Sequence, residues 1–593
     1  MKRNVTKILS LFIAAVLMFA AVVPAFAEGD SVKDCPTVII PGLFQSETRL
    51  YNDDGTVNDK YSAPFYLEPT NDIVKEALKR IGLPLSVTLI TQHDFKGKFA
   101  DKFAQAVADI VFSKVASDNQ GKPLYNIKAT DYPTSAANLS ERDRKYILDK
   151  IPLNDYVAST DLSHLYFLSY NSFGNINEIT DRLYNLIETA KKESGSDKVN
   201  LIPISQGGSI MNNLLARHPK VISSLKRVIY IVPAVDGSNV IGDLYEYGIN
   251  DSDDALYGYM WKQITKDETT GALVNLAVRL FPKKVLNDVL DKTMDAVIEK
   301  LKYSTAIWAL IPSEYYPDTS EKYLDGAEDS YIKSQTDEYY SAQVNAKSNI
   351  LKMRNAGVEV FDIVNYNYPL YSIADTWNTV NADGIIQLSS TSLGAVSAPV
   401  DSALPAGYTQ QGNSYGTCSD SSHNHIDPHN MVDASTGLLP DQTFYFYDGD
   451  HEKTARNDVI MKLATALLTD DNFTSVYSYP DKYPQFNNAR DSREYINDIN
   501  KLKNYDVSSL SDEQKDNVSK VLASSQASID NTNVDLDEYN KTKTEFYSVY
   551  DDVFGTNHNE TKKSNAFVLW LEKQVAKTVG NKGYSDVFRI SGS

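Results

Sequence analysis

Short apolar runs alternate with amphipathic segments over much of the chain. The runs are rich in Val, Ile, Leu, Phe and Tyr and occupy positions 37–40, 165–170, 199–202, 227–232, 358–364 and 443–447. Apolar residues recur at helical spacing from Ile176 to Ala190, and Gly195 follows as a helix stop. A further helix is expected from about Gly208 to Arg217. Strands and helices that alternate in this way predict a mostly parallel sheet with helices on both faces.

Two long segments depart from this alternation. Residues 240–345 read as helices with large apolar side chains, such as Trp261 and Trp308. They predict a lid or acyl-binding cap, although a helical subdomain with its own core would give the same pattern. Residues 476–593 are polar, with sparse apolar residues at helical spacing, and Ser511 with Gln514 fits a capping box. This segment predicts a separate C-terminal bundle of about three helices.

The first 27 residues have the features of a signal peptide. A basic start precedes an apolar run from Ile8, and Ala25-Phe26-Ala27 is a cleavage site of the A-x-A kind. A membrane anchor is the alternative, but small residues directly before Glu28 favour cleavage. No later stretch is long and apolar enough to span a bilayer. We therefore expect a secreted, extracellular protein without an integral membrane segment, whose main α/β domain spans residues 28–475.

Composition narrows the class of protein further. The 593 residues carry a formal net charge of −20, without basic stripes, which argues against nucleic-acid binding and against docking on anionic lipid. A hydrophobic share of 42% excludes a chain that is disordered throughout. Secretion permits a disulfide between Cys35 and Cys418, which are the two cysteines. The sequence leaves that pairing open.

The strongest chemical signal surrounds Ser205. A predicted strand runs into Ser205, then into Gly207 and Gly208, and then into a helix. A nucleophilic serine needs such a tight turn, because its hydroxyl must project above the sheet towards the start of a helix. An ordinary strand–helix turn with a serine cap is the alternative reading. The pattern G-x-S-x-G has Pro203 in place of its first glycine, and this departure bears on activity more than on fold.

A serine nucleophile needs a histidine base and a carboxylate that orients it. His451 lies between a predicted strand and a helix near the end of the sheet, where a catalytic histidine loop is expected. Asp383, in an Asp-Gly turn, is the preferred carboxylate, and Asp375 is the alternative. The backbone N–H groups of Leu43 and Gln206 are the expected oxyanion-hole donors.

These pieces together resemble the α/β-hydrolase family, and in particular its lecithin:cholesterol acyltransferase-like branch. The matching stretches are IIPGLFQSETRL, NLIPISQGGS, IWALIPSEYYP, NADGIIQLSS and DGDHEKTARN, in the right order within residues 35–470. The resemblance implies an α/β-hydrolase fold with a helical lid, a triad of Ser205, Asp383 and His451, no cofactor, and hydrolysis or transfer of lipid acyl esters. The C-terminal segment resembles three-helix modules of Gram-positive surface proteins, which implies contact with the cell surface.

Two further interpretations stay open. The loop Ser422–His429 contains His423, His425, Asp427 and His429, which could bind zinc or could form a polar loop over the active site; no metal is assigned.

The expected function is a secreted serine lipase or esterase, with acyl transfer to an alcohol as a variant. The alternatives are a catalytically inactive surface or binding protein, which Pro203 motivates, and a peptidase.

Overall fold

The computed structural model describes residues 31–58, 71–265, 268–418 and 420–558, together with parts of 568–575. The expected signal peptide, at residues 1–27, lies outside the described residues. Within the described ranges, every helix falls short of the length and hydropathy that a membrane-spanning segment requires.

A seven-stranded sheet forms the centre of the protein. Its strand order is β11-β10-β7-β6-β5-β1-β4, and every pairing within it is parallel. The bounds are β1 Thr37–Ile40, β4 Leu165–Phe167, β5 Val199–Pro203, β6 Leu225–Ile231, β7 Glu359–Tyr366, β10 Thr443–Tyr447 and β11 Phe486–Asn488. Six of these strands confirm the apolar runs found in the sequence. The seventh, β11, extends the sheet past residue 475, where we expected the hydrolase domain to end.

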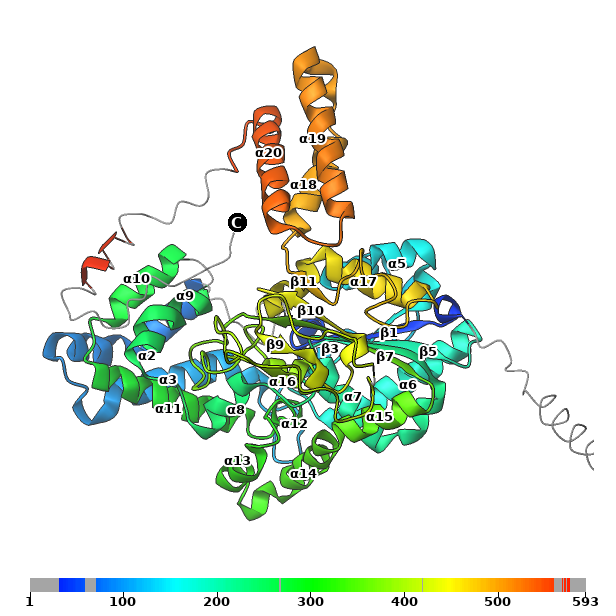
Figure 1. Ribbon diagram of the computed structural model, residues 1–593. Helices are drawn as coiled ribbons and strands as arrows, with labels where there is room; N and C mark the ends of the chain where they lie inside the picture. Colours follow the sequence, from blue (N-terminus) through cyan, green and yellow to red (C-terminus); the bar gives the residue numbers. More distant parts are fainter. Residues whose placement is uncertain are drawn as a thin grey trace, which may run out of the picture.

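Helices cover both faces of this sheet, as the alternation predicts (Figure 1). Val38 and Ile40 of β1 pack on one face with α6 (Ile176–Ser194), α7 (Gln206–Arg217) and α15 (Ala346–Asn355). Ile39 points the other way, towards α4 (Glu141–Lys150), α5 (Asn154–Ser159) and α17 (Asp458–Thr469). Neighbouring strand residues therefore bury into opposite layers, which is the period of two expected for a strand covered on both sides.

A helical lobe lies to one side of the sheet (Figure 1). It contains α2 (Asn71–Thr91), α3 (Lys98–Val107), α9 (Met260–Thr265), α10 (Glu268–Val278) and α11 (Lys283–Leu301). Phe99 and Ala100 of α3 share a small core with Val285 and Val289 of α11. The lobe therefore combines part of the expected 240–345 insertion with α2 and α3, which lie between β1 and β4 in the chain.

The rest of the 240–345 segment packs close to the sheet. It includes α8 (Asn239–Glu246), α12 (Thr305–Trp308), α13 (Tyr316–Tyr323) and α14 (Ser330–Val344). Fully buried Trp308 joins a cluster that also contains Leu43 and Ile386, which flank the expected active site. This segment thus links the helical lobe to the loops at the carboxyl ends of the strands.

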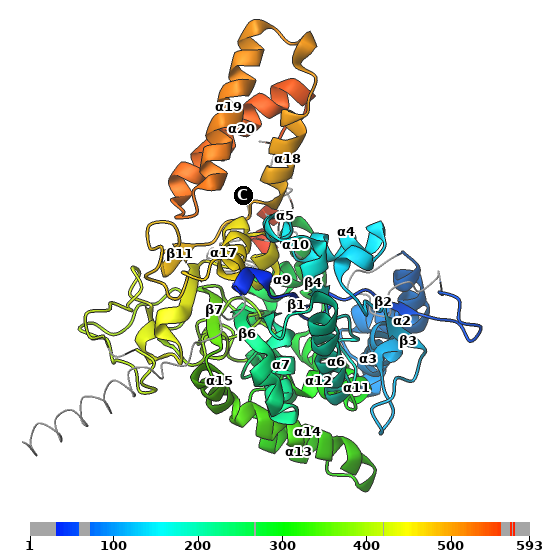
Figure 2. The same cartoon turned by 90° about the vertical axis from the view of Figure 1, so that its right-hand side faces the viewer.

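Three helices at the carboxyl end project away from the sheet (Figures 1 and 2). They are α18 (Arg493–Lys503), α19 (Asp512–Asp530) and α20 (Leu536–Phe554), and they share one apolar core. The Ser511–Gln514 capping box at the start of α19 is confirmed. Buried Arg490 ties the bundle to the sheet layer, because it pairs with Asp458 at 2.7 Å and donates to carbonyls of the α19 end.

Candidate active site

Ser205 lies in a strained turn between β5 and α7. Its φ of 53° and ψ of −118° fall where a residue with a side chain is rarely found. The Ser205 N–H donates to the Ile231 carbonyl of β6 at 3.1 Å, which holds the turn against the sheet. Because α7 begins at Gln206, the serine hydroxyl lies at the N-terminus of a helix, where partial positive charge accumulates. The local geometry is that of a nucleophile elbow.

Three glycines allow the chain to pack closely around this turn. A Cβ on Gly207 would lie 2.3 Å from the Ile40 carbonyl oxygen, and one on Gly208 would lie 2.8 Å from Pro233 Cβ. A Cβ on Gly42 would lie 2.8 Å from Ser205 Cβ. Each separation is shorter than a real contact between these atoms, so α7 and the loop after β1 can approach β5 only without side chains here. The Gly-Gly pair after the serine thus has a packing cause.

Pro203 fits the end of β5 without breaking its pairing. The residue stands opposite Ile40 in the parallel register, and the next two N–H groups attach the chain to both neighbouring strands, since Ile204 donates to the Ile40 carbonyl at 2.9 Å and Ser205 donates to the Ile231 carbonyl at 3.1 Å. Proline lacks an N–H group and has a fixed φ, and because it is the last residue of β5 the sheet loses at most one ladder bond there. The departure from G-x-S-x-G therefore leaves the turn intact.

The structure brings Ser205, His451 and Asp383 together. His451 Nε2 lies 2.9 Å from Ser205 Oγ, and His451 Nδ1 lies 2.6 Å from Asp383 Oδ2. Since an ionised carboxylate only accepts, Nδ1 carries the proton that it donates to Asp383, and Nε2 is left to accept the proton of Ser205. The three side chains come from positions that are far apart in the chain, after β5, β7 and β10.

Asp383 is held by its own loop. Its side chain is buried, and its Oδ1 accepts the N–H groups of Ile385 and Ile386 at 3.1 and 2.7 Å. Gly384 supplies the turn with a φ of 99°. These bonds occupy one carboxylate oxygen and leave Oδ2 for His451. Asp375, the alternative carboxylate, is exposed.

The surroundings of His451 shift its proton affinity. Burial lowers the pKa of His451, but the charge and hydrogen bond of Asp383 outweigh burial, and Asp450 and Glu452 act in the same direction as Asp383. The net result is a pKa above the ordinary value of 6.5. The backbone N–H of His451 also donates to the backbone carbonyl of Asp383 at 2.7 Å, so the two residues are joined through both their backbones and their side chains. The site is thus built to stabilise an imidazolium.

The expected oxyanion donors lie in the two segments that meet at Ser205. Gln206 follows the serine, and Leu43 follows Gly42, whose Cα faces the serine side chain. No acceptor among the described residues takes the N–H of Leu43 or of Gln206. The neighbouring amides in the Gly42 loop are occupied, since Gly42 donates to Gln45 Oε1 and Phe44 donates to Ser172 Oγ. The two N–H groups are thus available for a developing negative charge.

A buried polar clamp was missed in the sequence. Tyr170 OH donates to the Pro41 carbonyl at 2.7 Å and lies 3.1 Å from Gln206 Oε1. Gln206 Nε2 donates to the carbonyls of Ser172 and Ala306. Both side chains are buried, and together they fix the start of α7 against the loop after β1. Two sequence features could have indicated this contact: Tyr170 ends an apolar run, and Gln206 directly precedes Gly207 and Gly208.

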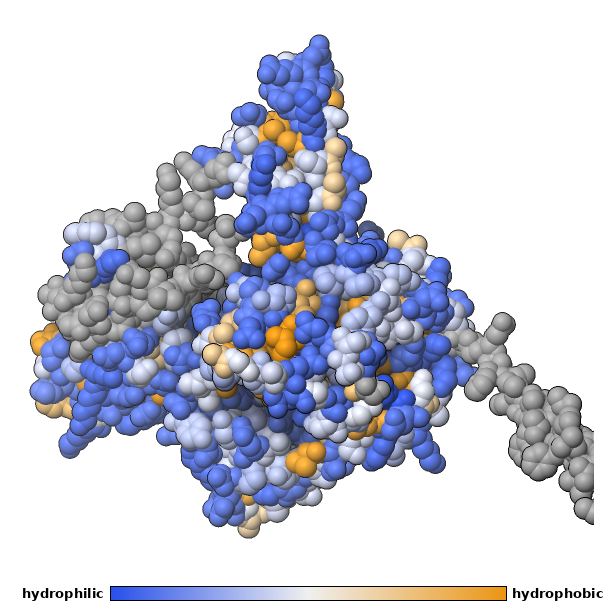
Figure 3. Space-filling model, viewed as in Figure 1, coloured by the Kyte–Doolittle hydropathy of each residue, from blue (hydrophilic) through white to orange (hydrophobic). Residues whose placement is uncertain are grey.

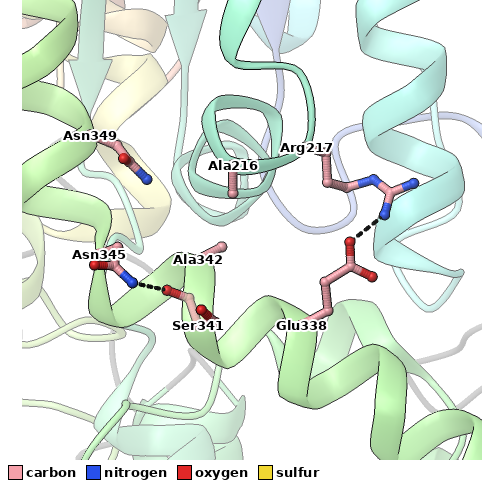
Figure 4. A pocket seen from close by; sticks show the side chains of 7 residues that line it. All are labelled: Ala216, Arg217, Glu338, Ser341, Ala342, Asn345 and Asn349. Atoms are coloured by element: carbon pink, nitrogen blue, oxygen red, sulfur yellow. Dashed lines mark hydrogen bonds and ion pairs between the residues drawn. The ribbon is translucent and has the colours of Figure 1, made fainter.

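A surface depression lies at the C-terminal end of α7, the end away from Ser205 (Figure 4). It lies between Ala216, Arg217 and the helices α14 and α15, and the charge of Arg217 is taken by Glu338 at 2.5 Å. The twelve residues of α7 span about 18 Å, which separates this depression from Ser205. Its lining residues include Ser341 but no histidine that could act as a base for it.

The histidine-rich loop does not act as one unit. His423 and His425 lie with Cys418 and Asp441. Asp427 instead shapes its own loop by accepting backbone N–H groups, and His429 stacks on Tyr447. Cys418 forms no disulfide with Cys35, which is buried beside β1.

Comparisons with known proteins give only distant likenesses. The chain matches no family model and no curated protein. A chain in the crystal structure of the Tle4–Tli4 complex is 11% identical with a TM-score of 0.31; the match covers 74% of this chain and 99% of that one. A serine hydrolase from the bacterium Cycloclasticus zankles is 14% identical with a TM-score of 0.12, over 30% of this chain and 71% of that one. TM-scores this low define neither a fold family nor a function for this chain.

Proposed function

We propose that this protein is a serine hydrolase of the α/β-hydrolase type that cleaves carboxylic esters. The observation that carries the proposal is the continuous hydrogen-bonded relay from Ser205 through His451 to Asp383, with the serine at a strained helix start. The order serine, aspartate, histidine along the chain is the order of that fold. Closer kinship with the lecithin:cholesterol acyltransferase-like branch rests on the sequence motifs alone.

The reaction follows from the positions of the groups. Ser205 Oγ attacks the ester carbonyl while His451 Nε2 takes its proton, and the carbonyl oxygen becomes negative near the N–H groups of Leu43 and Gln206. The imidazolium then protonates the leaving alcohol, and an acyl-enzyme remains. Water, or another alcohol, next gives a proton to His451 and attacks the acyl group. Ser205 recovers its proton as the acid or the new ester leaves.

Apolar side chains beside the site and on the helical lobe favour a hydrophobic acyl group. Leu43, beside the proposed oxyanion hole, packs in one apolar cluster with Ile385, Ile386 and residues of the 240–345 segment. In the helical lobe, Leu83, Val87 and Ile90 form an exposed apolar stripe on α2, with exposed fractions of 78%, 40% and 83%. The face drawn in Figure 3 is mainly hydrophilic, with separate hydrophobic patches. An exposed apolar stripe on a strongly acidic protein fits an uncharged or zwitterionic lipid ester.

A chain-length series of p-nitrophenyl esters tests the reaction class and this preference. We expect hydrolysis of esters, a higher kcat/KM for longer acyl chains, and no cleavage of matched p-nitroanilides. The reason is that each buried methylene adds about 0.8 kcal/mol of binding free energy. Cleavage of the anilides at comparable rates would identify a peptidase instead. Rates that fall steadily with acyl length would contradict the hydrophobic substrate.

The acid limb of the pH profile reports His451. The base works only when neutral, and the pKa of His451 lies above 6.5, so kcat/KM falls as the pH drops through a midpoint above 6.5. Replacing Glu452 with glutamine removes one of the charges that raise this pKa and moves the midpoint to lower pH. A wild-type midpoint below 6.5, or no shift in Glu452→Gln, would show that another group controls this limb.

We also propose that the protein is secreted, with residues 1–27 removed. The support is the basic, apolar and A-x-A order of the first residues. N-terminal sequencing of protein recovered from culture medium is expected to begin at Glu28. An intact Met1 on the exported protein would contradict cleavage.

A further inference from the structure

A second group of reactive side chains lies away from the triad. The potential ligand atoms of Cys418, His423, His425 and Asp441 all lie within 4.8 Å of one another, and we call this group the Cys–His cluster. Its first three members are on the loop between β8 (Val396–Ser397) and β9 (Val432–Asp433). Asp441 lies just before β10, whereas His451 follows the other end of that strand. The cluster therefore lies at the amino end of β10, whereas the candidate active site lies at the carboxyl end of that strand.

Four of the six separations between ligand atoms in the Cys–His cluster lie between 3.0 and 3.6 Å, close to the edges of a metal tetrahedron. Cys418 Sγ lies 3.5 Å from His423 Nδ1 and 3.6 Å from His425 Nε2. Asp441 Oδ1 lies 3.0 Å from the same His423 atom and 3.3 Å from the same His425 atom. Tetrahedral zinc, with Zn–S of about 2.3 Å and Zn–N or Zn–O of about 2.0–2.1 Å, gives edges of about 3.6 Å and 3.4 Å.

Hydrogen bonds outside the cluster direct the lone pair of His425 inwards. Gln485 Nε2 donates to the carbonyls of Pro440 and Thr443 at 2.7 and 3.2 Å, so its Oε1 is the atom that faces His425 Nδ1 at 3.1 Å. An amide oxygen can only accept, and Nδ1 therefore carries the proton. With Nδ1 as the donor to Gln485, Nε2 is the nitrogen that faces Asp441 and Cys418 and is placed to act as the metal ligand. A second hydrogen bond of this kind is typical of histidines that bind metals.

His423 is oriented in the same manner. Its Nδ1 faces the cluster, while its Nε2 lies 3.5 Å from the carboxylate of Asp420, on the outer side. The ring lies against Tyr477, with centroids 4.0 Å apart, and His425 is only 1% exposed. Both imidazoles are thus held by partners outside the cluster, and their inward nitrogens converge with a thiol and a carboxylate.

We propose that the Cys–His cluster binds one zinc ion in a closed tetrahedral site. One thiolate, two imidazoles and one carboxylate form a ligand set that suits zinc. Magnesium and calcium prefer oxygen ligands and suit this set less well. Four protein ligands leave no open position for a substrate, so the ion is structural. It fastens the loop between β8 and β9 to the start of β10. Cys418 then serves as a thiolate ligand rather than as a disulfide partner of Cys35.

Metal analysis of the whole protein tests this site. Protein prepared without metal-affinity steps, equilibrated with Zn²⁺ and then dialysed, is expected to retain one zinc per chain. Cys418→Ser and His425→Ala are expected to lose it. The matched control is His429→Ala, an exposed histidine of the same loop outside the cluster, which should keep the zinc. Wild-type protein without retained zinc, or equal loss in His429→Ala, would overturn the proposal.

Cobalt replacement provides a test on the wild-type chain that does not depend on whether a variant folds. After removal of metal with a chelator, Co²⁺ is expected to give the visible bands of a tetrahedral ion and a thiolate charge-transfer band. Asp420→Asn removes the negative charge that faces the outer nitrogen of His423, while its Oδ1 can keep accepting from the Ser422 N–H and hydroxyl, and it should lower the affinity by about 10-fold or more. Octahedral Co²⁺ bands without a thiolate transition would contradict the site, as would unchanged affinity in Asp420→Asn.

Discussion

Replacing Ser205 with alanine is expected to lower kcat for ester hydrolysis by about 10⁴- to 10⁶-fold. The variant loses the hydroxyl that the proposed mechanism acylates, while the helix start and the two N–H groups remain. At about 1.4 kcal/mol per tenfold change, this loss equals about 5–8 kcal/mol of transition-state stabilisation. Initial rates with the best p-nitrophenyl ester measure it.

The control is Ser341→Ala, at an exposed serine in the depression of Figure 4. We expect wild-type rates in this variant, because the depression contains no nucleophilic centre. Thermal unfolding of Ser205→Ala should stay close to wild type, since the one hydrogen bond that the Ser205 hydroxyl makes to a described side chain is the bond to His451. Rates in Ser205→Ala comparable with wild type would show that the elbow serine is not the nucleophile.

Replacing Asp383 with asparagine is expected to lower kcat by about 10⁴-fold without unfolding the loop. Asn Oδ1 can keep accepting the N–H groups of Ile385 and Ile386. Its amide group would stand where Oδ2 now faces His451 Nδ1, and an N–H donor there favours the tautomer with the proton on Nε2. That tautomer cannot accept the proton of Ser205, so the relay fails.

The pH profile separates this effect from a general structural one. Because Asp383 raises the pKa of His451, Asp383→Asn should move the acid limb of its residual activity to lower pH. The matched control is Asp375→Asn, which changes an exposed carboxylate and should leave rate and pH profile unchanged. A large loss in Asp375→Asn with little change in Asp383→Asn would reverse the assignment.

Much of the central sheet could be predicted because its strands are buried on both faces. Continuous apolar runs such as 199–202 and 443–447 have one explanation in a chain that alternates them with helices. The edge strand β11, with the sequence Phe-Asn-Asn, was missed. It has neither an apolar run nor a clear alternation, and it joins the sheet through backbone bonds to β10.

The helical lobe shows a second limit of sequence patterns. Helical spacing predicted helices in residues 240–345, but α11 packs most closely on α3, which lies far upstream. Periodicity shows that a helix has an apolar face and does not show which other helix covers it. The pairing of α3 with α11 could therefore be found only in the structure.

The candidate triad could be located from the sequence because chemistry restricts each member to a loop after a strand. The ligands of the proposed zinc site could be found only in part. His423 and His425 stood out as a pair, but their neighbours Asp427 and His429 lie outside the cluster, and Asp441 comes from another segment. The short spacing between His423 and His425 therefore identified the loop, and only the tertiary structure identified the full ligand set.

The nucleophilic role of Ser205 is tested most directly by a fluorophosphonate probe followed by peptide mapping. The relay predicts one covalent adduct per chain, located on Ser205, and none in Ser205→Ala. The rate of labelling should fall strongly in Asp383→Asn, because the probe also needs an activated hydroxyl. Folded wild-type protein that does not react with the probe, or an adduct on another residue, would contradict the proposed function.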